Sequence, residues 1–203
     1  MTGSLLVIAC GAIARELVQV QKLNQWDHIE FQCLPAELHN TPDRIPAAVE
    51  KMIHKWQAKY DNIFVAYADC GTGGLLDAML EKYHIQRIPG AHCYEFYTGN
   101  RVFEQLTDEE PGTFYLTDFL VHSFDRLVKV GLGLKRHPEL MSQYFGNYRR
   151  VVYLAQSDSV ALQKLAQEHA DYLGLDYEYR SCGLEPLDQT LKLSMPREVT
   201  WQS

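Results

Sequence analysis

Apolar and polar positions follow two different periods along this chain, and the two periods alternate. Runs of consecutive apolar or β-branched residues, such as 5–9 and 63–67, are typical of strands that are buried on both faces. Between these runs, apolar residues recur at every third or fourth position, which is typical of amphipathic helices. Further strands are predicted at 28–34, 85–88, 113–116, 150–155 and 176–180, and helices at 12–23, 42–60, 75–83, 95–106, 119–130, 137–145, 159–173 and 184–193.

Alternating strands and helices of these lengths predict an α/β fold, with a mostly parallel sheet or sheets flanked by helices. Three segments repeat the order strand, small or polar turn, helix: VIACGAIARELV, VAYADCGTGGLLDAML and VYLAQSDSVALQKLA. They indicate either an internal duplication of one βα unit or only the common pattern of α/β proteins. We expect a single domain over residues 1–203, with a loosely held tail at 194–203.

Composition and charge exclude several classes of partner. The 203 residues are 46% hydrophobic and 22% charged, which is ample for a folded core. A net charge of −7 argues against binding to nucleic acids or anionic membranes, and no apolar run approaches the roughly 20 residues needed to span a bilayer. The first residues form a predicted strand and lack the features of a signal peptide. An odd count of five cysteines argues against a disulfide framework, so we expect a cytoplasmic protein.

Three of the cysteines follow predicted strands at points where a helix is about to begin. Cys10 ends the first strand, Cys70 lies in the turn DCGTGG, and Cys93 lies in PGAHCYE. In a parallel sheet, these strand-to-helix junctions share one edge, and ligands usually bind at that edge. We therefore expect the three thiols to converge, although they are far apart in the sequence.

Competing interpretations of these cysteines are open. In the first, they are small apolar fillers, as free cysteine commonly is. In the second, they are metal ligands: three thiolates hold a [4Fe–4S] cluster and leave one iron open to polarise a small polar substrate. Zinc is the alternative cofactor, bound by the three cysteines or by two of them with His92 or Asp69. No CxxC spacing is present, so the metal interpretation depends on the predicted convergence.

A third interpretation is metal-free acid–base chemistry. Two cysteines that face each other across a cleft remove and return a proton beside a carboxylate, as in cofactor-independent amino-acid racemases. The turn DCGTGG looks loosely like the DSGxGG loop of those enzymes. Their later GCTH-like segment has no counterpart in this sequence.

Polar residues beside the cysteines are candidates for proton transfer and for binding. Asp69 precedes Cys70, and His92 and Glu95 flank Cys93, so these three side chains are the predicted catalytic residues. Glu95 is also explained as a first-turn residue that the helix dipole favours. Backbone amides of the glycine-rich turns are predicted to bind the cofactor or an anionic group, at Gly11, Gly71, Thr72, Gly73 and Gly74.

One face of the predicted helix 119–130 carries Asp118, His122 and Asp125. This spacing fits a metal site. A helix cap at Asp118 beside an exposed His122 is the preferred explanation.

Several motifs together resemble one known family. They are LVIACGAIARE, FVAYADCGTGG, IPGAHCYEFYTGN, EEPGTFYLTDFL, GLGLKRHPEL and YRRVVYLAQSD. The sequence is similar to a widespread bacterial and archaeal family catalogued as domain of unknown function sixteen-thirty-eight. The resemblance implies that Cys10, Cys70 and Cys93 are the motif cysteines, whereas Cys33 and Cys182 lie outside the motifs. It also implies a role beside corrinoid-dependent methyltransferases, in or near methylamine or one-carbon metabolism.

These observations combine into one expected function and two alternatives. We expect a cytoplasmic iron–sulfur enzyme, of the lyase, hydrolase or transferase type, that acts on a small-molecule substrate. Its plan of three separated cysteines is similar to that of quinolinate synthase, which holds a four-iron cluster in this way. The first alternative is an accessory protein that delivers or protects a metal or corrinoid for a partner methyltransferase. The second is the metal-free, racemase-like enzyme.

Overall fold

The computed structural model describes residues 4–196, and its contacts divide the chain into two compact units. Unit 1 contains the described residues up to Cys93 together with those from Leu187 onward, and unit 2 contains Tyr94–Pro186. The single domain expected from the sequence stays a prediction. Within the described residues, no helix is both long enough and apolar enough to cross a bilayer.

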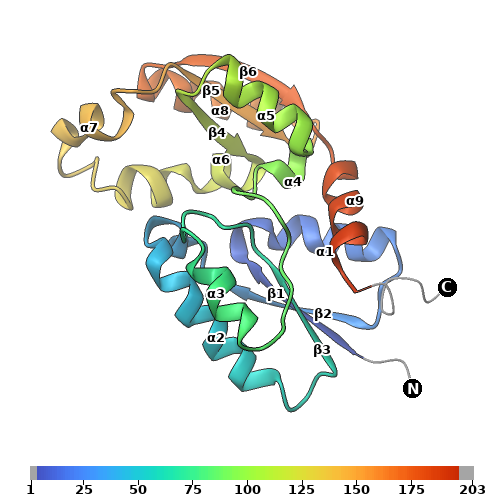
Figure 1. The fold of residues 1–203 in the computed structure, drawn as a ribbon. Coiled ribbons are helices and arrows are strands. Elements are labelled where there is room, and N and C mark those ends of the chain that lie inside the picture. Colours follow the sequence, from blue (N-terminus) through green and yellow to red (C-terminus); the bar gives the residue numbers. More distant parts are fainter. Residues whose placement is uncertain (1–3, 197–203) are drawn as a thin grey trace. The chain divides into compact units, whose positions relative to one another are not determined.

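Unit 1 is built on a parallel three-stranded sheet with the strand order β2-β1-β3 (Figure 1). Its elements are β1 (Leu5–Cys10), η1 (Gly11–Ile13), α1 (Ala14–Leu23), β2 (Ile29–Leu34), η2 (Ala36–Asn40), η3 (Pro42–Arg44), α2 (Ile45–Trp56), β3 (Asn62–Ala66) and α3 (Leu75–Glu81). The central strand β1 is buried along its whole length, which explains its unbroken apolar sequence.

Helices cover both faces of this sheet. The connection from β1 to β2 and the connection from β2 to β3 run in opposite directions across the sheet. Because such crossovers are right-handed, α1 and α2 lie on opposite faces. Helix α9 (Glu185–Ser194) returns to unit 1, where Asn24 Nδ2 donates a hydrogen bond to Asp188 Oδ1 at 2.6 Å, and Figure 1 shows α9 beside α1.

A fourth extended segment, 86–91, lies along the outer side of β3. Val65 N–H donates to Gln86 O at 3.0 Å, and Ile88 N–H donates to Val65 O at 3.0 Å. Further along, Asp69 N–H and Cys70 N–H donate to the carbonyls of residues 90 and 91 at 3.0 and 2.9 Å. The strand predicted at 85–88 is therefore present as a short parallel pairing, centred on a bridge between Val65 and Arg87.

Unit 2 is built on a second parallel sheet, with the strand order β4-β5-β6. Its elements are α4 (Glu95–Thr98), α5 (Asn100–Glu109), β4 (Thr113–Thr117), α6 (Asp118–Phe124), the π-helical turn η4 (Asp125–Val130), η5 (Pro138–Leu140), α7 (Met141–Phe145), β5 (Arg150–Ala155), α8 (Val160–Leu173) and β6 (Asp176–Ser181). Both crossovers run in the same direction here, so α6 and α8 cover the same face of the sheet.

Alternate residues of the unit 2 strands enter two different hydrophobic clusters. One cluster joins Leu116 and Tyr153 to side chains of α6 and α8. The other joins Tyr115 and Val152 to Phe103 of α5. This alternation is the period of two expected for a strand that is covered on both faces.

The structure confirms the predicted α/β class with parallel sheets. Two of the predicted helices differ from the observed ones in their interior. The predicted helix 95–106 is interrupted at Gly99, whose φ of 74° ends α4 and begins α5. The helix predicted at 119–130 becomes π-helical from Asp125. The two sheets differ in strand order, so a duplication could involve only single βα units and not a whole unit. Met195 of the predicted loose tail is buried, and 197–203 lie outside the described residues.

Candidate functional site

The turn between β3 and α3 is organised by the carboxylate of Asp69. Its Oδ1 accepts hydrogen bonds from the Thr72 hydroxyl at 2.6 Å and from Gly74 N–H at 2.9 Å, and Oδ2 accepts one from Gly73 N–H at 3.0 Å. Burial by itself raises the pKa of Asp69, but these hydrogen bonds and the nearby Arg87 outweigh it and lower the pKa below its ordinary value. Asp69 is therefore an ionised group that fixes the shape of the turn.

Cys70 occupies a left-handed backbone conformation, with a φ of 50°. This conformation costs a residue with a Cβ about 1–2 kcal/mol, whereas glycine adopts it freely. The hydrogen bond from Cys70 N–H to Ala91 O, at 2.9 Å, holds the residue in place. A thiol kept at a position that suits glycine better indicates a functional role for the side chain.

The three motif cysteines lie together at the carboxyl edge of the unit 1 sheet. Cys10 ends β1, Cys70 follows the neighbouring β3, and Cys93 comes two residues after Ala91, the partner of Cys70 N–H. All three are free thiols and only 6–8% exposed. Each interacts electrostatically with the other two, Cys10 with Cys70 and Cys93 with both. Their role as metal ligands stays a prediction.

The thiols of Cys70 and Cys93 interact closely, and this interaction moves their two pKa values in opposite directions. Donation from the Cys93 side chain, helped by backbone N–H groups of Cys93 and Ala68, outweighs burial and lowers the pKa of Cys70. The same interaction, followed by burial and the charge of Cys70, raises the pKa of Cys93 well above its ordinary value. In this pair, Cys70 ionises first and Cys93 keeps its proton as the donor.

Cys10 is the third thiol of the group and is as buried as Cys70. Burial raises its pKa to about 11, and the charge of Cys70 acts in the same direction. Ala12 N–H donates a hydrogen bond to its sulfur at 3.4 Å and opposes that shift. A cation or a hydrogen-bond donor would be needed to hold this side chain as a thiolate at neutral pH.

Strand register and exposure separate Cys33 from the group, although its charge also acts weakly on Cys10. Cys10 is paired with Leu34 on β2, so the side chain of Cys33 is one position out of step and points to the opposite face of the sheet. Cys33 is exposed. Cys182 belongs to unit 2 and is half-buried.

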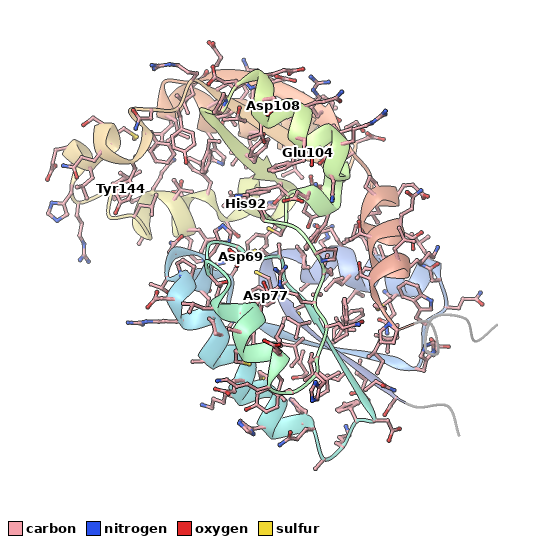
Figure 2. The ribbon with its side chains drawn as sticks, in the orientation of Figure 1. Asp69, Asp77, His92, Glu104, Asp108 and Tyr144 are labelled. Atoms are coloured by element: carbon pink, nitrogen blue, oxygen red, sulfur yellow. The ribbon has the colours of Figure 1, made fainter. Side chains whose placement is uncertain are left out.

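Two histidines lie at the same edge, and the sequence analysis identified only one of them. His92 precedes Cys93, and His39 lies in η2, directly after β2. Burial and then the charge of His92 lower the pKa of His39, so the two rings are near each other. Both side chains are exposed to solvent. The pKa of His39 is nevertheless lowered by burial, because many protein atoms surround its ring. Figure 2 shows His92 and Asp69 at this end of the unit, with Asp77 further along α3.

The predicted cofactor-binding glycines have structural reasons to be glycine. A Cβ on Gly11 would lie 2.9 Å from the carbonyl oxygen of Leu34, which is too close for any side chain. The N–H groups of Gly73 and Gly74 already donate to Asp69. Cofactor binding stays a prediction for Gly11, Gly71, Thr72, Gly73 and Gly74.

Among residues 4–196, no group of three or more His, Cys, Asp or Glu side chains is arranged to hold a metal ion. The zinc alternative therefore has no preformed ligand set in this part of the chain. Cys10, Cys70 and Cys93 are the residues that would hold a larger cluster, and that role stays a prediction.

The acidic groups predicted in unit 2 have structural partners. Asp118 accepts hydrogen bonds from the Tyr153 hydroxyl at 2.7 Å, from Gln156 N–H at 2.9 Å and from the Ser157 hydroxyl. The cap of α6 is Thr117, whose hydroxyl accepts from Leu120 N–H at 3.3 Å. Within the predicted Thr117-Asp118 cap, Thr117 is therefore confirmed, and the cap assigned to Asp118 is wrong.

Glu95 also belongs to unit 2. It begins α4 and is buried. Its catalytic role stays a prediction.

Fold and site define an α/β protein in which buried free thiols meet at the carboxyl edge of a parallel sheet. The family model described as protein of unknown function, DUF1638, matches residues 33–191, and the chain belongs to this family. The match contains Cys70 and Cys93 with their flanking residues, and Cys10 precedes it. No curated protein matches the chain, and no solved structure matches it.

Proposed function

We propose that Cys10, Cys70 and Cys93 hold a [4Fe–4S] cluster in unit 1, and that the protein is an enzyme acting on a small polar substrate there. The observation that carries this proposal is the meeting of three buried, free thiols from three separate strand ends. Thiolates are the usual ligands of such clusters, and three of them leave one iron open, which supplies Lewis-acid polarisation of a substrate oxygen when the cluster is bound.

The electrostatics of the three thiols define what a bound metal would have to offset. The pKa of Cys10 is raised by burial and by Cys70, and the pKa of Cys93 is raised by its hydrogen bond to Cys70 and by burial. Three thiolates at this edge would therefore repel one another in a poorly solvated place. Bound iron would offset that repulsion, because a metal ion deprotonates the thiols that coordinate it.

Residues beside the thiols would handle protons. We assign this role to His92, because it immediately precedes Cys93 in the chain, its side chain is exposed, and imidazole is a common general acid–base group. Asp69 is a second candidate, although its carboxylate is occupied by three donors of the turn. Its main contribution in this proposal is to hold Cys70 in position.

One observation favours a second function, metal-free thiol chemistry. The interaction with Cys93 lowers the pKa of Cys70, so less free energy is needed to ionise the Cys70 thiol, whether or not a metal is bound. A racemase-like reaction needs two thiols on opposite sides of a substrate carbon. Cys70 and Cys93 touch each other, so Cys10 and Cys70 would be the flanking pair.

The metabolic setting is proposed from the family resemblance. The substrate proposed here belongs to methylamine or one-carbon metabolism, and the proposed partner is a corrinoid protein or methyltransferase. An accessory role in delivering or protecting a metal or corrinoid is compatible with the same thiol site. Turnover of a small substrate by the isolated protein would favour the enzyme over the accessory protein.

The test is anaerobic reconstitution with ferrous iron and sulfide, followed by iron and sulfide analysis and visible absorbance. We expect about four irons and four sulfides per chain in the wild type. Single Cys→Ser variants at 10, 70 and 93 should lose the cluster, whereas Cys33→Ser and Cys182→Ser should keep it. A colourless wild type with substoichiometric iron and sulfide would refute the cluster, and loss of iron in Cys33→Ser alone would show that the ligands were wrongly chosen.

A further inference from the structure

Tyr67 carries a buried hydroxyl for which the described residues provide no hydrogen-bond partner of good geometry. The side chain is 2% exposed. It follows Phe64, Val65 and Ala66, which are apolar and fully buried. Leaving such a polar group unpaired costs about 1–3 kcal/mol, and phenylalanine would fill nearly the same space without that cost. The hydroxyl therefore needs an explanation other than packing.

Strand register shows where this hydroxyl lies. Ala9 of β1 is paired with Ala66 of β3, so the next residues, Cys10 and Tyr67, are level with each other. Side chains that are level on neighbouring strands point to the same face. Electrostatics agree with this placement, because Tyr67 interacts with the Cys10 sulfur and more weakly with Cys70.

The Cys10 sulfur, which lies beside the Tyr67 hydroxyl, is a poor hydrogen-bond acceptor while the thiol is protonated. A neutral thiol accepts hydrogen bonds weakly, and the contact with the Cys10 sulfur falls short of a full hydrogen bond. An anionic sulfur is a much stronger acceptor, because hydrogen bonds to ionised groups are about twice as strong as neutral ones. The same O–H favours the thiolate form of Cys10.

We infer that Tyr67 is a positioning residue that donates its O–H to the anionic sulfur of this centre, the thiolate of Cys10 or a sulfur bound next to it. The part of this inference that concerns a cluster rests on the proposed function. The part that concerns the Cys10 thiolate does not depend on a cluster. In the loaded protein, the O–H would stabilise the added negative charge of the reduced centre. Loss of this donor should therefore lower the reduction potential without removing a ligand.

The experiment compares Tyr67→Phe with wild type in the full chain, reconstituted anaerobically. We expect unchanged iron content, a lower reduction potential in potentiometric titration, and an apo-protein that melts about 2–4 °C higher because an unpaired polar group is gone. A purely structural role would move the melting temperature alone. An unchanged potential, or an apo-protein of lower stability, would overturn the inference.

The control is Tyr60→Phe, also in unit 1. The Tyr60 hydroxyl is satisfied, since it donates to Glu30 Oε2 at 2.5 Å, so its loss should lower the melting temperature and leave the potential unchanged. Equal shifts of the potential in both variants would overturn the assignment of Tyr67.

If the wild type binds no iron, the proposed cluster fails and the apo-protein decides the inference. Cd²⁺ titration of the apo-protein, followed by the ultraviolet absorbance of thiolate–cadmium bonds, should then show about tenfold weaker binding in Tyr67→Phe, because a charge-assisted hydrogen bond to the bound Cys10 sulfur is lost. Cys33→Ser should bind Cd²⁺ as tightly as the wild type does. Equal Cd²⁺ affinities in wild type and Tyr67→Phe, or no cadmium absorbance in the wild type, would overturn the donor role.

Discussion

Arg87 holds the carboxylate of Asp77 with two hydrogen bonds, from Nε to Oδ1 at 2.6 Å and from Nη2 to Oδ2 at 2.7 Å. Its remaining nitrogen, Nη1, donates to the carbonyl oxygens of Ile88 at 2.8 Å and Gly90 at 3.3 Å. The guanidinium thus ties helix α3 to the loop that leads to Cys93. The position of the third thiol depends on this tie as well as on the pairing with β3.

Arg87→Lys should loosen that loop, because an ammonium keeps the charge but cannot form the planar fork. Asp77 is 55% exposed, so most of the expected loss, about 1–2 kcal/mol, comes from the two carbonyl hydrogen bonds and little from the ion pair. Hydrogen exchange should become faster at the amides of Ile88 and Cys70. Arg180→Lys, which alters an exposed ion pair in unit 2, is the control and should leave these amides unchanged. Slow exchange retained in Arg87→Lys would contradict the tie.

Asp69→Asn should destabilise the turn by about 1–2 kcal/mol in urea unfolding at neutral pH, because the second carboxylate oxygen and the charge are lost. Since the pKa of Asp69 is lowered on folding, its contribution is present above the unfolded pKa of about 4 and is lost as the pH falls through the folded value. The difference between wild type and variant should therefore shrink in acid. The exposed Asp61→Asn should change stability by less than about 0.5 kcal/mol. A difference that does not shrink in acid would argue against the carboxylate as its cause.

Cys70→Gly should be more stable than Cys70→Ala by about 1 kcal/mol, because only glycine adopts the left-handed conformation without strain. The usual order is the reverse, with alanine preferred. The matched pair is Cys93→Gly and Cys93→Ala, where φ is not positive and alanine should be the more stable. Chemical unfolding of the four variants measures both differences. Alanine preferred at both positions would show that Cys70 is not strained in solution.

His169 should make the protein sensitive to mild acid. The ring is buried, stacks on Phe124 with 4.0 Å between centroids, and contacts Val121 O through Nε2 at 3.0 Å. Burial lowers the pKa of His169 below its ordinary 6.5. The unfolded chain therefore binds the proton more readily, and stability falls as the pH drops below about 6.5 toward the folded pKa.

His169→Gln should remove this dependence. Between about pH 6.5 and pH 5 the wild type should lose more stability than the variant, whereas above pH 7 the two stability profiles should be parallel. Thermal melts across this range measure the effect. The exposed His122→Gln, in the same unit, is the control and should follow the wild-type profile. A His169→Gln profile that also parallels wild type in acid would show that another group is responsible.

Much of the fold follows from local patterns in the sequence. The unbroken apolar run of β1 indicates a strand covered on both faces, and the shared edge of a parallel sheet is sufficient to bring Cys10, Cys70 and Cys93 together. Helix interruptions were harder to place. The break at Gly99 and the π-helical turn from Asp125 lie inside patterns whose apolar spacing continues across them.

The less predictable features depend on which strands are neighbours. Tyr67 looks like one more core residue until the register of β1 and β3 places it level with Cys10. His39 comes several residues after β2, and its proximity to His92 depends on the path of the intervening turn. The sequence did offer one indication for His39. It follows β2, whose carboxyl end lies at the same edge of the unit 1 sheet as the three cysteines. The boundary between the two units was not predicted, because the amino-acid composition does not change there.

The segment 86–91 is hydrogen-bonded to the sheet on its β3 side, is tied to α3 by Arg87, and buries the side chain of Ile88. A segment in this place can detach while β1, β2 and β3 stay hydrogen-bonded to one another, so local opening should require much less free energy than unfolding of unit 1. The segment that leads to Cys93 would then move, while the strands that lead to Cys10 and Cys70 stay fixed. Loading or loss of a centre would proceed in the folded protein, at a rate that sub-denaturing urea hardly changes.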